Sequence, residues 1–135
     1  MKGFDEYKIK HLEFIQSVIN RMASNSFAMK GWMIAIVAAL LALYADSEPN
    51  NESYLLIAVG VVSLFWIIDS YYLYVEKKYV DLYNDIIHGK SKIMDFDLST
   101  KKYSNICKFF DAMFCSVSTI LLYLPIVIIL WIFAV

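Results

Sequence analysis

Three long apolar stretches divide the chain, over residues 27–45, 54–75 and 109–135. A helix that rises about 1.5 Å per residue needs roughly 20 residues to cross the ~30 Å hydrocarbon core of a bilayer. Each stretch is of about this length, and one charged residue interrupts each of them: Lys30, Asp69 and Asp111. The pattern predicts an all-α integral membrane protein with three transmembrane helices.

Pro125 leaves a second topology open for the last stretch. A tight helical hairpin at this proline would return the C-terminus to the side from which the span started. The ten residues that follow it are too few to cross a bilayer, so the pattern favours a full third crossing.

The segments between the spans are predicted to be helical as well. In residues 1–26, apolar side chains recur at helical spacing among polar ones, at Leu12, Ile15, Val18, Ile19 and Met22. This amphipathic helix is expected to lie on the membrane surface or to pack on a partner subunit, and the chain is expected to turn into the membrane near Ser24–Ser26.

The second span is expected to continue as a helix into the region 76–108, as far as Ile87, with Gly89 as a left-handed stop. A short loop over 90–98 should follow. Asp97 or Ser99 is then expected to cap a helix that runs without a break into the third span.

Charge sets the orientation of these spans. All twelve Lys and Arg residues lie in or beside 1–30 and 76–108, and none falls in the connector 46–53 or after Lys108. The positive-inside rule therefore predicts a cytoplasmic N-terminus, with the connector and the C-terminus outside, in a bacterial inner membrane. No small-residue cleavage site follows the first stretch, so a cleaved signal peptide is not expected.

Composition argues against catalysis. Of 135 residues 60 % are hydrophobic, which indicates a single helical membrane domain with little chain left for a soluble enzyme fold. The two histidines are His11 and His88, and Cys107 and Cys115 are expected to stay reduced. No metal-ligand spacing, phosphate loop or nucleophile motif occurs, so we expect no catalytic residues, no metal and no cofactor.

Asp69 is the most informative single residue, because it lies about seven residues inside its span, where an unpaired carboxylate is costly. Lys30 should reach a comparable depth on the neighbouring antiparallel span, which predicts a Lys30–Asp69 ion pair. The pair either fixes helix packing or lines an ion path in an oligomer. A third possibility is a protonated Asp69 that hydrogen-bonds to Tyr72 or Asn25.

Two further patterns concern helix association. The third span places Asp111, Cys115, Ser118 and Thr119 near one helical face, which predicts either a pore lining or hydrogen bonds between helices. Small residues at Gly31, Ala35 and Ala39 would let another helix approach closely, and three spans form only a thin bundle. We therefore expect an oligomeric bundle of identical chains within the lipid bilayer.

Lysines gather in the region 76–108, which is expected to be the second cytoplasmic region. In an oligomer they would form a basic site for a nucleotide or a single-stranded nucleic acid. Interleaved aromatic residues, among them Tyr79, Tyr83 and Tyr103, are suited to stacking on bases. Topology alone accounts for an excess of lysine on this side, so the alternative is a patch without a ligand. The expected ligand residues are Lys77, Lys78, Lys90, Lys92, Lys101 and Lys102, with Lys108 beside them.

Short motifs carry a resemblance to a known family. They are the run from Arg21 through Ser26 to Trp32, the residues Trp66, Asp69, Tyr71, Tyr72, Leu73 and Glu76, and the run Asp95–Ser99. Over roughly residues 15–105 the chain resembles small transmembrane effectors of bacterial anti-phage defence, of the Hailong type that is paired with a nucleotidyltransferase. The resemblance implies an oligomeric channel that a nucleic-acid product of the partner enzyme holds closed, with the basic region as the ligand site.

Two functions remain open at this point. The first is a membrane effector whose assembled spans conduct ions when a cytoplasmic ligand changes, which would depolarise the cell and arrest its growth. The second is a non-conducting anchor or scaffold that recruits a soluble partner through the N-terminal helix and the region 76–105.

Overall fold

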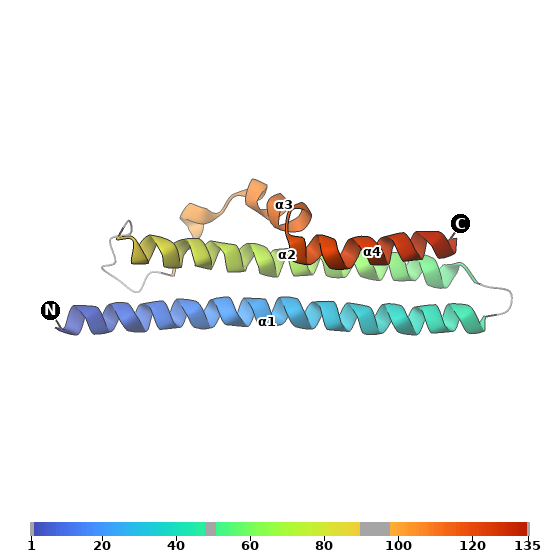
Figure 1. Cartoon of the computed structure of the whole chain (residues 1–135), viewed down its shortest axis with the longest axis horizontal. Coiled ribbons are helices and arrows are strands. Elements are labelled where there is room, and N and C mark those ends of the chain that lie inside the picture. The colour runs from blue at the N-terminus through green and yellow to red at the C-terminus, as the bar shows by residue number, and fades with distance from the viewer. Residues whose placement is uncertain (1, 48–50, 90–97, 135) are drawn as a thin grey trace.

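The computed structural model describes residues 2–47, 51–89 and 98–134, and this part of the chain is all-helical, with no strand. Its elements are α1 (Lys2–Asp46), α2 (Ser53–Ile87), the short 3₁₀ helix η1 (Lys101–Tyr103), α3 (Ile106–Phe114) and α4 (Val117–Ala134). Figure 1 shows α1 and α2 as two long antiparallel rods, with α4 lying along one half of α2 and α3 turned away from it.

Apolar positions spaced alternately three and four residues apart hold the two rods together. Along α2 they run from Leu55 through Ala58 and Val62 to Phe65, and the same spacing then reaches Asp69. Met33 and Val37 of α1 pack against this seam. Such heptad spacing keeps one stripe of each helix facing the other, as in an antiparallel coiled coil. A polar residue at a seam position is therefore buried between the helices.

Both rods are longer than a membrane is thick. At about 1.5 Å per residue, the 45 residues of α1 extend about 68 Å and the 35 residues of α2 about 52 Å. Each contains a stretch long and apolar enough to cross a membrane. Beyond these apolar stretches the two helices continue side by side. We use the name module for this part of the molecule, which comprises residues 6–25 of α1, residues 76–87 of α2 and η1.

The predicted turn at Ser24–Ser26 is wrong, because α1 runs through these residues without a break. The apolar face of the N-terminal segment is covered by the extension of α2, where Ile15 packs with Leu82 and Ile86. Ser26 is buried on the same face. The amphipathic segment therefore has a partner within its own chain, which explains why it does not turn onto the membrane surface.

The end of α2 confirms the prediction: the helix ends at Ile87, and Gly89 has φ +67° in the left-handed region. The predicted continuous helix after it is wrong. Asp97 lies outside the described residues, Ser99 is not helical, and η1 is separated from α3. Asn105 caps α3 instead, since its side chain accepts a hydrogen bond from the backbone N–H of Cys107 at 3.0 Å.

The continuous third span predicted over 109–135 is also wrong, since the chain bends by 55° between α3 and α4 at Cys115 and Ser116. A new helix starts here because the Ser116 carbonyl accepts both the backbone N–H of Ile120 at 3.0 Å and the Thr119 hydroxyl at 2.8 Å. Hydroxyl side chains that donate to nearby carbonyls compete with the regular backbone hydrogen bonds of a helix. We call the bend the elbow.

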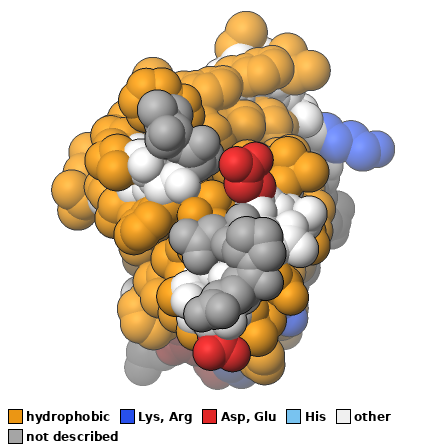
Figure 2. All heavy atoms as spheres, turned by 90° about the vertical axis from the view of Figure 1, so that its right-hand side faces the viewer, with side chains coloured by type: hydrophobic (Ala, Val, Ile, Leu, Met, Phe, Trp, Pro, Cys, Tyr) orange, Lys and Arg blue, Asp and Glu red, His pale blue; other side chains and the backbone are white. Residues whose placement is uncertain are grey.

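The 18 residues of α4 still extend about 27 Å, close to the hydrocarbon thickness, so the bent pair is a third candidate span. Pro125 lies inside α4 and makes no hairpin. The C-terminus accordingly reaches the end of the molecule at which α1 connects to α2 (Figure 1). Figure 2 looks onto this end and shows that hydrophobic side chains make up most of the surface visible around it.

Candidate functional site

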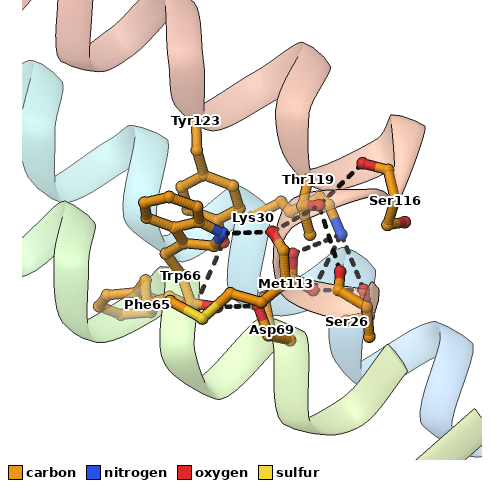
Figure 3. Close-up of polar contacts among 11 residues, drawn as sticks. Ser26, Lys30, Phe65, Trp66, Asp69, Met113, Ser116, Thr119 and Tyr123 are labelled. Carbon is orange, nitrogen blue, oxygen red and sulfur yellow. Dashed lines mark hydrogen bonds and ion pairs between the residues drawn. The ribbon is translucent and has the colours of Figure 1, made fainter. Parts of the chain in front are cut away.

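The site is built around Asp69, whose side chain is fully buried between α1 and α2. The Lys30 ammonium lies 2.8 Å from Oδ2 of Asp69 and 2.9 Å from Oδ1, so the predicted ion pair is confirmed. The Lys30 side chain keeps 14 % of its surface exposed. A carboxylate in an apolar bundle is tolerated when a cation reaches both of its oxygens, as Lys30 does here (Figure 3).

Ser26 completes the pair. Its hydroxyl donates to Oδ1 of Asp69 and accepts a hydrogen bond from the Lys30 ammonium at 2.7 Å. Ser26 and Lys30 are four residues apart on α1 and therefore share a face. Ser26 thus donates a hydrogen bond to Asp69, whereas the third possibility drawn from the sequence named Tyr72 or Asn25. The four-residue spacing of Ser26 and Lys30 was the signal that could have identified it.

Side chains from α2 and α4 fasten the elbow over this pair. The Trp66 indole N–H donates to the Met113 carbonyl at 3.1 Å, and the ring stacks on Tyr123 with centroids 6.0 Å apart. The Tyr123 hydroxyl donates to the Phe65 carbonyl at 3.3 Å. The bond from Trp66 satisfies the Met113 carbonyl in the last turn of α3, where a helix supplies no backbone partner.

The structure divides the residues predicted to form an ion path. Asp69 and Thr119 are buried and Lys30 is half-buried, and Figure 3 shows Thr119 on the elbow side of the pair. Asp111 and Ser118 are exposed, and the bend places them on different helices. They therefore do not share one continuous helical face with Thr119, because the single helix assumed by the sequence pattern is interrupted between them.

Three ion pairs join α2 to η1 and α3. In each pair a lysine Nζ atom lies close to an aspartate Oδ2 atom. The distances are 3.2 Å for Lys77 and Asp111, 2.7 Å for Lys108 and Asp81, and 3.2 Å for Lys102 and Asp85. The three α2 residues are four positions apart and therefore lie on one face of the helix. Each of them faces a residue of opposite charge. We call this set the ladder. It ties the module to α3.

Tyr103 strengthens the last pair of the ladder. Its hydroxyl donates to Oδ2 of Asp85 at 2.6 Å, and the Lys102 ammonium lies over its ring at 5.4 Å. Burial, then the hydrogen bond to Asp85 and the charge of that carboxylate, raise the pKa of Tyr103 to about 12. The phenol therefore stays protonated and keeps donating throughout the physiological pH range.

The ladder changes the view of the predicted ligand lysines. Lys77 and Lys102 are engaged with carboxylates, and the Lys78 ammonium lies 4.6 Å from the centre of the Tyr74 ring. Lys101 is exposed, while Lys90 and Lys92 lie outside the described residues. Part of the positive charge that the sequence displays is thus balanced within the chain.

Exchanging the charges of one rung tests the ladder. Lys108→Asp should place two carboxylates together and loosen the α3 segment, while Asp81→Lys with Lys108→Asp should restore it. Partly exposed pairs contribute about 0.2–1 kcal/mol each. Hydrogen–deuterium exchange of residues 101–111 in micelles measures the effect. A double variant as loose as the single one would contradict the pairing, and the wild-type protection should fall at high salt.

The small residues Gly31, Ala35 and Ala39 are exposed on α1, on a face that α2 does not cover. A Cβ atom added at Gly31 would meet no atom within 4 Å. The chain therefore leaves these three residues uncovered. Among the described residues there is also no group of three or more metal-ligating side chains placed to hold an ion.

No family model, curated protein or solved structure matches this chain. The geometry of the chain itself therefore carries the inference of function.

Proposed function

We propose that the chain is the subunit of an oligomeric membrane effector, in which the module receives a cytoplasmic ligand and the assembled spans conduct ions. One observation carries this proposal: α1 and α2 run without a break from the module to the Lys30–Asp69 pair. Displacing one end of a stiff helix displaces the other. A ligand that prefers one arrangement of the module would therefore shift the arrangement of the spans.

The buried pair suits a switch with two states. Inside the protomer its charges are matched, and in a water-filled lumen they would be hydrated, but an intermediate with one unmatched charge in an apolar bundle is costly. The ladder adds a second connection, because it joins α2 to α3 and the elbow covers the pair. Movement of the module thus reaches the pair along two routes.

The proposed ligand is a nucleotide or a single-stranded nucleic acid. Lys78 and Lys101 stand apart from the ladder in the part of the chain that the structure describes. An oligomer would repeat them around its axis. The resemblance to Hailong-type effectors supplies the setting: a partner nucleotidyltransferase makes the ligand, and channel opening depolarises an infected bacterial cell through its inner membrane and arrests growth.

Oligomers should form through the small-residue face of α1. Gly31→Leu with Ala35→Leu is expected to shift the purified protein toward monomers, because two added side chains keep helix backbones apart by more than such an interface tolerates. Gly60→Leu on α2 is the matched control, since it also adds a side chain in open space. Light scattering in detergent measures the mass. An unchanged mass for the first variant would remove this face from the interface.

Conduction is tested by ion flux from liposomes loaded with a potassium-sensitive dye. Wild-type protein should conduct, and Asp69→Asn should change the flux strongly, because it removes the charge that the pair matches. Lys78→Gln with Lys101→Gln should leave the flux intact while weakening its response to an added oligonucleotide. Lys10→Gln is the control for surface charge, since Lys10 pairs with Glu6 at an exposed site. Tight liposomes under every condition would contradict the proposal.

A scaffold is the second candidate function, and exposed apolar side chains on the module favour it. Phe14 and Ile87 are about half exposed although they lie beyond the predicted spans. Such side chains are typical of a docking surface for another protein. A scaffold predicts tight liposomes together with a module that binds a partner.

A further inference from the structure

The elbow forms one side of a partly open apolar hollow of about 330 Å³. Trp66 of α2 and Phe114 of α3 form two of its walls, and α4 supplies the rest through Thr119, Ile120, Tyr123, Leu124, Val127 and Ile128. The hollow exists because α3 leaves α4 at 55°, so the two helices cannot close over α2 together. It lies at the start of α4, where a candidate span begins.

The outer face of α3 indicates what surrounds this hollow. Ile106, Phe110 and Phe114 are four residues apart, form one stripe, and are each more than half exposed. The opposite face carries Lys108 and Asp111, which join the ladder. A helix with one charged and one aromatic face, at the end of a span, is suited to the boundary between headgroups and acyl chains. Its apolar stripe leads through Phe114 into the hollow.

A docked protein helix would fill the hollow only with single side chains. A helix is about 10–12 Å across with its side chains, so it cannot enter a hollow of about 330 Å³ as a whole. A single hydrocarbon chain is much thinner and needs no hydrogen-bond partner. The lining, apolar apart from the Thr119 hydroxyl and the polar edges of Trp66 and Tyr123, matches that requirement.

We propose that the elbow is a lipid-binding site that holds one acyl chain of a phospholipid from the leaflet in which α3 lies. Trp66, Thr119 and Tyr123 belong both to the wall of the hollow and to the groups that cover the Lys30–Asp69 pair. The acyl chain completes the apolar cover on that side and keeps water from the pair. The site exists whether or not the protein conducts, so it goes beyond the proposed channel.

Quenching of Trp66 fluorescence by brominated lipid tests the site. Trp32→Phe with Trp131→Phe leaves Trp66 as the single tryptophan, and both replaced residues are exposed on the surface of the chain. The protein is placed in dioleoylphosphatidylcholine vesicles with or without the dibrominated form of the same lipid. Leu124→Phe adds a ring in the hollow, and Leu121→Phe adds the same ring on the same helix away from it.

Trp66 should be quenched in the single-tryptophan protein and equally in Leu121→Phe, whereas Leu124→Phe should lower the quenching by about two-fold, because the ring occupies the volume of the chain. Ile128→Phe should act like Leu124→Phe, and circular dichroism confirms that each variant is folded. Equal quenching in all variants would mean contact with bulk lipid and no site. Quenching that appears only when the protein is diluted in lipid would assign the hollow to a second copy and overturn the proposal.

Discussion

Replacing Asp69 by leucine should destabilise the folded protein by roughly 3–5 kcal/mol, because the Lys30 ammonium is then left without its counter-charge inside the bundle. The Lys30 side chain is only 14 % exposed, so it has little access to water in its present position. The loss of stability is measured by unfolding the protein in mixed micelles with an increasing fraction of denaturing detergent, followed by circular dichroism. We expect the unfolding midpoint to fall well outside the error of the wild type.

The matched control is the Glu6–Lys10 pair, whose ammonium and carboxylate lie 3.2 Å apart at an exposed site on α1. Glu6→Leu should cost less than about 1 kcal/mol, since exposed pairs contribute little. If Asp69→Leu cost no more than this control, the buried pair would not stabilise the helix packing.

The double variant Lys30→Met with Asp69→Leu should recover most of the lost stability, because uncharged side chains of similar size need no partner. It also separates folding from conduction. A stable double variant that no longer conducts would show that the charges serve ion flow, while unchanged conduction would limit them to helix packing.

Ser24→Pro should produce the second large effect, a loss of about 3 kcal/mol or more, because proline removes a backbone donor and clashes within a helix interior. Ser24 is exposed in the middle of α1, so its side chain makes no part of the seam. Ser24→Ala is the control and should be neutral or slightly stabilising. The proline should also separate the module from the bundle, since the continuity of α1 joins them.

Hydrogen–deuterium exchange distinguishes the two views of this segment. In the continuous helix, Ser24→Pro should expose amides over residues 11–22, where Ile15 packs with Leu82 and Ile86. A turn at Ser24–Ser26 would accept proline without loss of protection. That result would restore the surface-bound N-terminal helix that the apolar pattern first suggested.

The residues themselves determined much of this architecture. Length and hydropathy located the apolar stretches of α1 and α2, since hydrocarbon thickness sets a minimum for any helix that crosses it. Depth along antiparallel helices was enough to pair Lys30 with Asp69, because rise per residue is constant. The glycine at position 89 also marked the end of α2. Glycine adopts the left-handed backbone conformation by itself, so this feature does not depend on contacts with distant residues.

Only the tertiary structure decided the features that depend on partners distant in the chain. The N-terminal segment continues α1 because its apolar face meets Leu82 and Ile86, which a local pattern cannot choose over a membrane surface. The bend at Cys115–Ser116 holds because Trp66, some fifty residues earlier, bonds to the Met113 carbonyl. The ladder is a similar case. The sequence shows the sign of each charge, but not which charged residue it pairs with. Hydropathy records how apolar each segment is, whereas the partner that covers it is set by the packing of the whole chain.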